Sequence, residues 1–452
     1  TVTISAGSTN ADIDVAGILV TESGLDTTVG EGGSTDTFTV QLTAQPATAV
    51  TLTVVSDDTG EATVDQATLL FTTIDWNVAQ TVTVTGIDDG QLVDGPQTTT
   101  VTIAVDDAAS DDEYDPVADE TVSVTTTDDD VASFTVTESG GSTSVDEDGA
   151  GNTDTFTVVL DNQPGGNVVV DVSSGSPGEA QAAPTSLVFT TSNWNVAQTV
   201  TVTGQDDTPF VDGPQLSTIT LAVNDGLSDD LWDPVADQTV SVTTNDTDIA
   251  AFSITETGGN TVVNEDDTAG NNTDTFTVQL DAQPNGSVTF DIGSDDNGEA
   301  TERPVNLPFS KSHWNTPQVV TVTGTDDNII DATQNSTTTV SVNQPATTPL
   351  FDGMAAQTVS VATLDDDVAG FTLTPSGATV VTEAAGAGNI DDFTLVLDAE
   401  PASNVVLNVQ SGDLSEFTFS PATVTFTPSN WSTPQTVTIT GVDDDFDDGD
   451  QT

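Results

Sequence analysis

A tryptophan phrase that recurs four times divides this chain of 452 residues into repeats of domain length. It reads DWN, NWN, HWN and NWS, at intervals of 118, 120 and 117 residues, and contains Trp76, Trp194, Trp314 and Trp431. A phenylalanine in phrases such as DTFTVQL recurs at the same intervals, as Phe38, Phe156, Phe276 and Phe393. The period is too long for a solenoid unit and suits whole domains.

Asp-rich phrases mark the boundaries between repeats. They predict repeat one at 15–130, repeat two at 131–248, repeat three at 249–367 and repeat four at 368–452, the last of them incomplete. Repeat four stops at DGDQT, before its expected sixth strand, whereas the chain begins with TVTIS, which resembles TTVTIAV in repeat one. We therefore expect residues 1–14 to form a strand that completes a preceding repeat or the fourth repeat of a neighbouring copy.

Apolar residues in repeat one alternate with Thr, Ser or Gln, the period-two pattern of half-buried antiparallel strands. Seven short strands with turns between them predict an immunoglobulin-like sandwich. The expected fold class is all-β, with tandem antiparallel β-sandwich repeats in an elongated array. The predicted strands lie near 17–22, 38–42, 50–54, 68–72, 82–84, 101–105 and 122–124.

The charge balance restricts the partners of the chain. Asp and Glu number 74 against two basic residues, Arg303 and Lys311, so the formal net charge is -72. Nucleic acids and anionic membranes need Lys/Arg patches, so neither is expected as a partner, and no apolar run is long enough for membrane insertion. Cations are the natural partners of this composition.

The sequence offers little for catalysis. There is no Cys and one histidine, His313, so neither a zinc cluster nor a Cys–His pair can form. Paired carboxylates recur in every repeat, whereas an active site normally occurs once per chain. We therefore predict no catalytic residues and no enzyme activity.

The acids occupy particular loops. Strands of a sandwich run up and down, so every second loop lies at the same pole, the one that faces the next repeat. Crowded carboxylates repel one another unless a cation neutralises them, and Ca²⁺ takes six to eight such oxygens. The alternative is that the acids only hold solvent, but they recur at fixed loop positions. In repeat one this pole collects Glu22, Glu31, Asp36, Asp57, Asp58, Glu61, Asp88, Asp89, Asp94 and Asp128 to Asp130.

Several phrases resemble Calx-β and related repeats of large bacterial surface adhesins. They are FTVTES (134–139), GEAT (60–63 and 298–301), QTVTVTGIDD (80–89) and VDDDFDDGDQT (442–452), with the DDD linkers, and the similarity covers nearly the whole chain. The resemblance implies calcium sites built from an early glutamate, mid-domain acids and the linker.

The implied Ca²⁺ ligands follow by motif, residue by residue. Repeat four departs from the pattern, because Pro375 occupies the place of the early glutamate. The implied ligands are Glu22, Glu61, Asp88, Asp89, Asp128, Asp129 and Asp130 in repeat one; Glu138, Glu179, Asp206, Asp207, Asp246 and Asp248 in repeat two; Glu256, Glu299, Asp326, Asp327, Asp365, Asp366 and Asp367 in repeat three; and Glu416, Asp443 and Asp444 in repeat four.

Two sets of aromatic residues recur. The tryptophan of each repeat could form a sugar platform, but its regular position favours packing against the sandwich. A second aromatic lies in the long loop of repeats one to three, as Tyr114, Trp232 and Phe351. For this set we expect contacts between domains in preference to a ligand surface.

Together these features predict a structural, calcium-stabilised extracellular repeat protein that forms a stalk, fibre or filament on a microbial surface. Its expected partners are other copies of itself, assembled head to tail by strand complementation. The alternative is an adhesin region that recognises a glycan or a surface protein. Exposed aromatic side chains gathered on one face would favour that alternative.

Overall fold

The computed structural model of this chain describes residues 14–266, 270–384, 386, 388–445 and 449–451. The chain divides into two units: one holds repeat one and repeat two up to residue 245 without residues 207–213, and the other holds residues 207–213 together with the chain from residue 246 onward. Each unit is described by itself. The strand predicted at residues 1–14 falls, apart from Asp14, outside the described residues.

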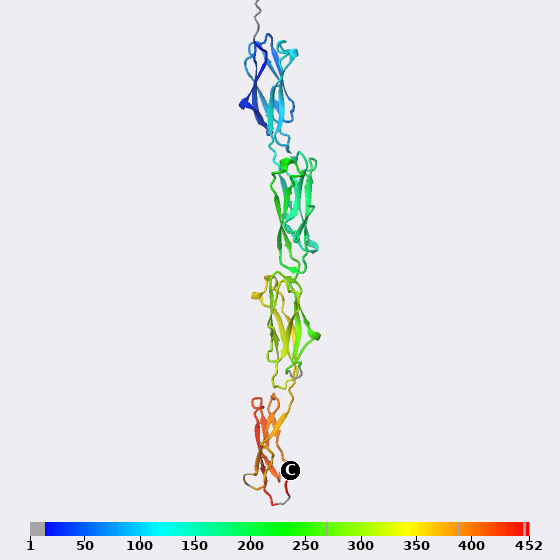
Figure 1. Cartoon of the computed structure of the whole chain (residues 1–452), viewed down its shortest axis with the longest axis vertical. Coiled ribbons are helices and arrows are strands. Elements are labelled where there is room, and N and C mark those ends of the chain that lie inside the picture. The colour runs from blue at the N-terminus through cyan, green and yellow to red at the C-terminus, as the bar shows by residue number, and fades with distance from the viewer. Residues whose placement is uncertain (1–13, 267–269, 385, 387, 446–448, 452) are drawn as a thin grey trace, which may run out of the picture. The chain divides into compact units, whose positions relative to one another are not determined.

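Repeat one is a sandwich of two facing sheets (Figure 1). The four-stranded sheet has the order β1-β3-β7-β5, and the five-stranded sheet has the order β2-β10-β9-β4-β6. The fold is all-β, as predicted, with short 3-10 turns as the only helical segments among the described residues. The strands are β1 (Ile18–Glu22), β2 (Thr27–Gly30), β3 (Thr35–Leu42), β4 (Val50–Ser56), β5 (Ala62–Val64), β6 (Thr68–Phe71), β7 (Gln80–Gly86), β8 (Leu92–Val93), β9 (Gln97–Val105) and β10 (Glu120–Thr127).

The core lies between the two sheets, where the alternating apolar residues meet. Phe38 pairs with Val82 in the four-stranded sheet, and both are fully buried, as are Leu52 and Val101 opposite them. Thr and Ser fill most of the outward positions. Burial of the apolar face stabilises each repeat by roughly 25 cal/mol per Å² of apolar surface. The seven predicted strands are confirmed as β1, β3, β4, β6, β7, β9 and β10.

Two strands of the sandwich were not predicted, β2 and β5. The chain leaves β1 through a 3-10 turn in which Gly24 has φ +78°, a conformation that favours glycine, and crosses to the other sheet. There β2 pairs with β10 in parallel, from Thr27 beside Val124 to Gly30 beside Thr127. The sandwich is therefore antiparallel except for this pair of its second and last strands.

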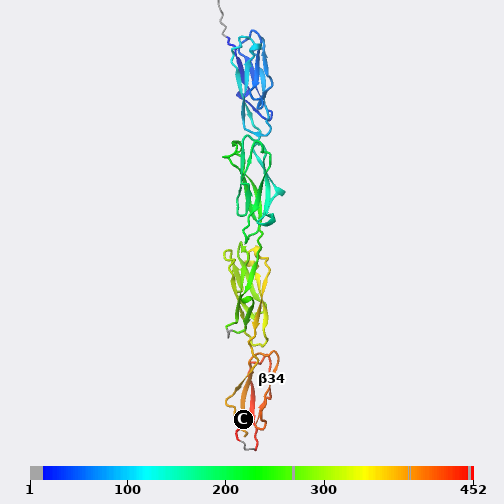
Figure 2. The same cartoon turned by 90° about the vertical axis from the view of Figure 1, so that its right-hand side faces the viewer.

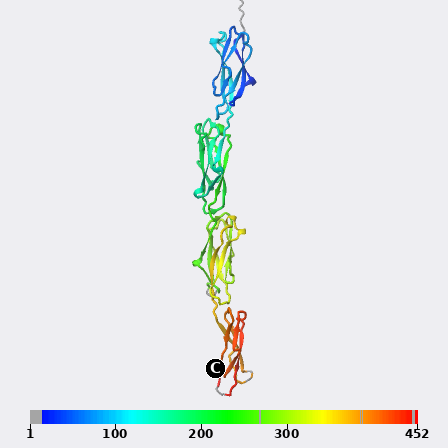
Figure 3. The ribbon, with the colours of Figure 1, turned by 180° about the vertical axis from the view of Figure 1, so that it is seen from behind.

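Repeats two and three repeat this plan, with sheets β11-β13-β18-β16 and β12-β21-β20-β15-β17, then β22-β24-β29-β27 and β23-β31-β30-β26-β28. Figure 3 shows the layered sheets from behind. The strands of repeat two are β11 (Phe134–Glu138), β12 (Thr143–Asp146), β13 (Thr153–Leu160), β14 (Gln163–Pro164), β15 (Val168–Ser174), β16 (Ala180–Ala183), β17 (Ser186–Phe189), β18 (Gln198–Gly204), β19 (Phe210–Val211), β20 (Gln215–Val223) and β21 (Gln238–Asn245). Those of repeat three are β22 (Phe252–Glu256), β23 (Thr261–Asn264), β24 (Thr273–Leu280), β25 (Gln283–Pro284), β26 (Val288–Ser294), β27 (Ala300–Arg303), β28 (Asn306–Phe309), β29 (Gln318–Gly324), β30 (Gln334–Val342) and β31 (Gln357–Leu364).

Repeat four has one complete sheet and one narrow one. The sheet β32-β33-β37-β35 matches its counterparts, but in the described residues the second sheet holds only β34 and β36 (Figure 2). Phe371 at the start of β32 is 52% exposed, whereas its counterpart Phe134 is 2% exposed. The strands are β32 (Phe371–Pro375), β33 (Ile390–Leu397), β34 (Val405–Asn408), β35 (Phe417–Ser420), β36 (Thr423–Phe426) and β37 (Gln435–Gly441).

The 3-10 turns are short, and among the described residues all but η4 have a counterpart in another repeat. They are η1 (Ser23–Leu25), η2 (Asp107–Ala109), η3 (Ser139–Gly141), η4 (Gly149–Gly151), η5 (Asp230–Trp232), η6 (Thr257–Gly259), η7 (Gln344–Ala346) and η8 (Pro349–Phe351). Most of them connect one sheet to the other or shape the long loop before the last strand.

The two aromatic sets have different outcomes. The four tryptophans are partly buried against the core of their own repeats, which confirms the packing interpretation. Tyr114, Trp232 and Phe351 are at most 1% exposed and belong to the cores of their own repeats. The prediction of inter-domain contacts is wrong for Tyr114, whereas the cores that hold Trp232 and Phe351 also include Val93 and Val211 from the preceding repeat. The Tyr114 hydroxyl donates a hydrogen bond to the Ala44 carbonyl (2.5 Å). The long loop therefore folds back over the end of its own sandwich.

Candidate metal centres

Carboxylates from four segments of repeat one meet at one end of the sandwich, as the order of its strands predicts. These segments are the residue after β2, the residue before β5, the loop between β7 and β9, and the linker after β10. We call this set the acidic end of repeat one. It consists of Glu31, Glu61, Asp89, Asp94, Asp128 and Asp130.

The parallel strand pair places Glu31 beside the linker. The Glu31 amide donates to the Thr127 carbonyl (3.2 Å), so the ladder continues one residue past β2, and Asp128 follows directly. Gly86 permits this approach, since a Cβ at Gly86 would lie 2.3 Å from the Gly30 carbonyl oxygen. Glycine at the end of β7 therefore allows the backbone before Glu31 to pack against it.

Glu31 is the most confined of these carboxylates. Its side chain is 1% exposed, and neither carboxylate oxygen has a hydrogen-bond partner. Burial, and then the neighbouring charges of Asp128, Asp89, Asp94 and Glu61, raise the pKa of Glu31 to about 7. A buried carboxylate without a donor or a cation is costly, so the site requires a positive partner to hold Glu31 as an anion.

Asp128 is the most firmly held of the set. Its Oδ2 accepts hydrogen bonds from the amides of Asp94 (3.1 Å) and Gly95 (2.8 Å), and its Oδ1 accepts one from the amide of Asp130 (2.7 Å). Three amides fix this carboxylate in place before any ligand binds. It therefore joins the linker to the loop between β7 and β9.

Glu61, Asp89 and Asp94 form the other side of the acidic end. One buried oxygen each of Glu61 and Asp94 has no hydrogen-bond partner. Burial, followed by the charge of Asp94, raises the pKa of both Glu61 and Asp89. These oxygens, like those of Glu31, are available to coordinate a cation.

Repeat three reproduces this arrangement within the second unit. Glu265 is 3% exposed, and one oxygen each of Glu265, Asp365 and Asp367 lies within 4.8 Å of the others. Burial, and then the charges of Asp327, Asp365, Asp331 and Glu299, raise the pKa of Glu265 to about 7.

The linker carboxylate is again held by three amides. Asp365 accepts hydrogen bonds from Asp331 (3.0 Å), Ala332 (2.7 Å) and Asp367 (2.9 Å). Buried oxygens of Glu299, Asp331 and Asp367 have no hydrogen-bond partner. The same geometry in a second repeat indicates a built arrangement and not an accident of one loop.

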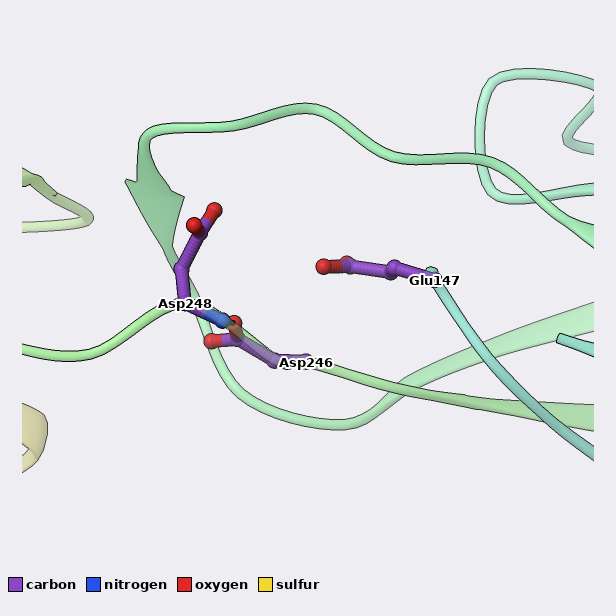
Figure 4. A group of neighbouring side chains, drawn as sticks. All are labelled: Glu147, Asp246 and Asp248. Atoms are coloured by element: carbon purple, nitrogen blue, oxygen red, sulfur yellow. Dashed lines mark hydrogen bonds between the residues drawn. The ribbon is translucent and has the colours of Figure 1, made fainter. Parts of the chain in front are cut away.

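In repeat two, the residues that correspond to Glu31, Asp128 and Asp130 are Glu147, Asp246 and Asp248, which Figure 4 labels. Asp246 accepts hydrogen bonds from the amides of Asp212 (2.9 Å), Gly213 (2.7 Å) and Asp248 (2.8 Å), the pattern of Asp128 and Asp365.

Repeat four is different. Glu383 occupies the position of Glu31, since Gly441 approaches the backbone at Thr382 and Glu383, but its side chain is half-buried and not fully buried. Asp443 and Asp444 are described, whereas residues 446–448 of the same loop are not. The confined glutamate of the other repeats therefore has no buried equivalent here.

The donor set favours a hard cation. Every candidate ligand is a carboxylate, which suits Ca²⁺ or Mg²⁺, whereas copper, nickel and zinc favour the imidazole and thiolate that these sites lack. The one histidine, His313, is exposed and lies beside Ser310 and Ser312. A crowded, irregular group of carboxylates fits the variable six- to eight-fold coordination of Ca²⁺ better than the strict octahedron of Mg²⁺.

Some of the resemblance-based ligands lie in the acidic ends, and the early glutamates lie elsewhere. Glu61, Asp89, Asp128 and Asp130, with their counterparts in repeat three, lie in the acidic ends described above. The early glutamates take another contact: Glu22 accepts a hydrogen bond from Thr27 Oγ1 (2.8 Å), and Glu138 and Glu256 do the same from Thr143 (2.7 Å) and Thr261 (2.9 Å). Their role as ligands stays a prediction.

Some members of the acidic ends were absent from the implied ligands, although Glu31 and Asp94 were expected at this pole. Two positions were absent from the implied ligands. One is the buried glutamate that follows the second strand, β2 in repeat one. The other is the aspartate that follows two apolar residues in the loop between β7 and β9. The sequence does carry a signal for the first, because VGE, VDE and VNE recur before each DTF phrase. The residues concerned are Glu31, Glu147 and Glu265, and Asp94, Asp212 and Asp331.

Comparison with known proteins does not assign the chain to a family. No protein-family model matches the chain, and no curated protein matches it. None of the helical turns in the described residues is long and apolar enough to cross a bilayer.

Several solved structures match this chain with low scores. One is the protocadherin gammaB7 EC3-6 cis-dimer, at 12% identity over 94% of this chain and 91% of that chain, with a TM-score of 0.34. Others are domains 4 and 5 of the S-layer protein SbsC (15% identity, 52% and 100% covered, TM-score 0.22) and CBD12 from CALX1.2 (12% identity, 50% and 98% covered, TM-score 0.19). Identities and TM-scores at this level identify no family and assign no ligand.

Proposed function

We propose that this chain is a structural, calcium-stabilised repeat protein that forms part of a stalk, fibre or filament outside a microbial cell. The observation that carries this proposal is Glu31, a carboxylate 1% exposed with no hydrogen-bond partner on either oxygen, surrounded by four further acids. Both basic residues of the chain lie in repeat three, so no side chain of repeat one can neutralise it. A divalent cation would supply the positive charge that keeps Glu31 ionised.

Six carboxylates at the acidic end supply enough oxygen atoms for Ca²⁺. Glu31, Asp128 and Asp130 would contribute from one side and Glu61, Asp89 and Asp94 from the other. The early glutamate Glu22 and the outer linker acid Asp129 remain proposed ligands from the family resemblance. Bound calcium would neutralise the repulsion that otherwise opposes closure of this end.

The extracellular location belongs to the same proposal. Extracellular modules bind calcium with dissociation constants of about 10⁻⁴ to 10⁻³ M, and such sites fill only where calcium is millimolar. A role other than catalysis is supported by the recurrence of the same acids in successive repeats. The alternative, an adhesin surface for glycan or protein, gains no support from exposed rings: Phe371 is the one aromatic among the exposed large hydrophobic side chains of the described residues.

A calcium titration of the full chain tests the proposal. Isothermal titration calorimetry should detect binding, and thermal melting should shift upward on adding Ca²⁺, with a smaller shift for Mg²⁺ at equal concentration. Calcium at 100 times its dissociation constant would add about 2.7 kcal/mol per site. A chain that neither binds calcium nor changes its melting temperature would show that the proposal is wrong.

We also propose that the open side of β34 accepts a strand from a second copy, head to tail. In repeat one the corresponding strand β4 pairs with β9 as well as with β6, whereas among the residues that the structure describes β34 pairs only with β36. Leu373 is 50% exposed and Leu407 is half-buried, so the apolar face of repeat four is only partly covered. The segment TVTIS at residues 1–5 resembles TVTIA of β9 and would suit this place.

Sedimentation velocity at rising concentration tests this assembly. The full chain should form species larger than its 46.3 kDa mass, and removing residues 1–14 should abolish them. Identical sedimentation of the full and shortened chains would rule out strand exchange through this segment.

A further inference from the structure

The loop between β7 and β9 of repeat one carries an apolar pair among its acids. We call residues 87–96 the coupling loop of repeat one. Asp89 and Asp94 belong to the acidic end, and between them lie Leu92 and Val93, which form β8. One short loop therefore contributes to a charged site and to an apolar contact.

The apolar pair contacts repeat two. β8 pairs in parallel with β14, with Leu92 beside Gln163 and Val93 beside Pro164. The Gln163 amide also donates to the Gln91 carbonyl (2.6 Å). Val93 is 4% exposed and belongs to the buried core of repeat two, not to that of its own repeat. Repeat one thus supplies a strand and a core side chain to the sandwich that follows it.

The charged and apolar contacts are adjacent in sequence. The amides of Asp94 and Gly95, the two residues after Val93, donate to the Asp128 carboxylate. Gly95 itself lies against repeat two, since a Cβ added there would lie 3.4 Å from Leu231 Cδ2. The position of Val93 in the neighbouring core is therefore set by groups that belong to the acidic end.

The next coupling loop has the same form. Residues 207–213, which lie in the sequence between β18 and β20 of repeat two, group with repeat three. Phe210 and Val211 pair with Gln283 and Pro284, and Val211 is 4% exposed within the core of repeat three. The Lys311 ammonium lies 4.4 Å from the centroid of the Phe210 ring, a cation–π contact that adds to the docking.

We infer that a cation bound at the acidic end of one repeat stabilises the core of the following repeat, through the coupling loop. This inference rests on the proposed function. Without a cation, the repulsion of Asp89 and Asp94 by Glu31 and Glu61 opposes the hydrogen bonds that tie the loop to Asp128, and any movement of the loop away from these charges would withdraw Val93. With a cation, the same acids hold the loop in place and Val93 stays buried in repeat two.

Linkage makes this coupling reciprocal. If the cation favours the docked loop, a docked loop favours the cation, so removing the Val93 side chain must weaken calcium binding at repeat one. The coupling is also directional, because each loop contacts the repeat that follows it. Each ion would therefore contribute to two successive sandwiches.

Hydrogen exchange of the full chain, with calcium and after its removal, tests the coupling. Val93→Ala should lower by about tenfold the ratio between the protection of β15 and β20 in repeat two with calcium and their protection without it, a change within the usual range of coupling between two sites. Repeat three should be unaffected. Val211→Ala should lower the calcium-dependent protection of repeat three and leave that of repeat two unchanged. Val55→Ala, at a valine of repeat one that is 55% exposed, should change the protection of neither repeat.

The outcomes separate the inference from the proposed function. If the wild-type chain gains no protection from calcium anywhere, both fail. If calcium protects the residues around Glu31 and Asp128, but repeat two responds to calcium in Val93→Ala as it does in the wild type, the coupling alone is overturned. Val93→Thr keeps the side-chain volume and should give the same loss with a smaller packing defect, should the alanine variant unfold repeat two.

Discussion

The amide of Asp94 donates a hydrogen bond to the carboxylate of Asp128, 3.1 Å away and 34 residues later in the chain. This contact joins the loop that reaches into repeat two to the linker that leads to repeat two. Two chain segments at the same end of one sandwich are thus fixed to each other. The carboxylate that fixes them also faces Glu31, so the geometry of the end depends on how its charge is compensated.

Glu31→Gln should have opposite effects with and without calcium. The amide removes a buried charge, so the metal-free chain should become more stable by about 1 to 3 kcal/mol, while the stabilisation by calcium at repeat one should shrink. Urea unfolding in both conditions measures the two changes.

Glu22→Gln is the comparison for that variant, because Glu22 already accepts a hydrogen bond from Thr27. We expect it to alter calcium stabilisation less than Glu31→Gln does. A larger loss from Glu22→Gln would identify the early glutamate as the principal ligand, as the family resemblance implies.

Stability of the metal-free chain should fall as the pH rises from about 4.5 to about 7. Burial raises the pKa of Glu31 and Glu265 to about 7 in the folded chain from an ordinary value of 4.5. The folded state then binds more protons than the unfolded state across this interval, so raising the pH favours unfolding, by roughly 1 to 3 kcal/mol for each repeat.

Urea midpoints at pH 5 and pH 7.5 measure this dependence. Saturating calcium should remove most of it, because the ion displaces the protons. Carboxylates with a lowered pKa, such as Asp36, which accepts a hydrogen bond from Ser23, lose their contribution only below about pH 4 and do not interfere. A metal-free chain that is more stable at pH 7.5 than at pH 5 would contradict the account of Glu31.

Gly86→Ala should damage both the fold and the site of repeat one. The added Cβ would lie 2.3 Å from the Gly30 carbonyl oxygen, so the backbone before Glu31 has to move. We expect a loss of about 2 to 4 kcal/mol in repeat one and weaker calcium binding there. Calorimetry and urea unfolding measure both.

Gly178→Ala is the matched control for Gly86→Ala. No atom beyond its chain neighbours lies within 4 Å of a Cβ added at Gly178, and its φ is not positive. The substitution should leave stability nearly unchanged. Equal effects of the two substitutions would mean that the close approach at Gly86 is unimportant.

Repeat four of the isolated chain should exchange its amide hydrogens faster than the other repeats. Phe371 is 52% exposed, whereas the counterparts Phe134 and Phe252 are 2% and 5% exposed, so less apolar surface is buried around β33. Hydrogen exchange at low protein concentration should show β33 opening before β13 and β24. Uniform protection of all three strands would contradict this expectation.

Much of the sandwich follows from the alternation of apolar and polar residues, which is strong in β3, β7 and β9. The two strands that the sequence did not reveal are three and four residues long, too short to show a period. The parallel pairing of β2 with β10 depends on the crossing at Gly24, a three-dimensional event that a local pattern does not encode. The sequence alone therefore predicted the two layers of the sandwich but not the parallel pairing of β2 with β10 in the five-stranded sheet.

The acidic end was predictable in position but not in detail. Strand alternation places Glu61, Asp89 and Asp128 at one pole, and the structure brings them together with Glu31. The special role of Glu31 arises from its burial, which results from pairing between β2 and β10. The recurring VGE, VDE and VNE phrases mark the position of this glutamate, but its burial is a property of the folded chain.

The coupling loop shows the same limit. Leu92 and Val93 look like two apolar residues in an ordinary acidic loop, and their contact with Gln163 and Pro164 is visible only once the repeats are folded. The aromatic Tyr114 was misjudged for the converse reason. A residue in an exposed-looking acidic loop proved to be part of the core of its own repeat.

The parallel pairing of β2 with β10 has a mechanical consequence. Tension on the two ends of repeat one reaches β2 from its first residue and β10 from its last, so it pulls the strands along each other in opposite directions. Four residue pairs, from Thr27 with Val124 to Gly30 with Thr127, then resist sliding together, whereas a peeled hairpin would give way one pair at a time. Repeats two and three hold the same pair, β12 with β21 and β23 with β31, and each would resist extension in the same way.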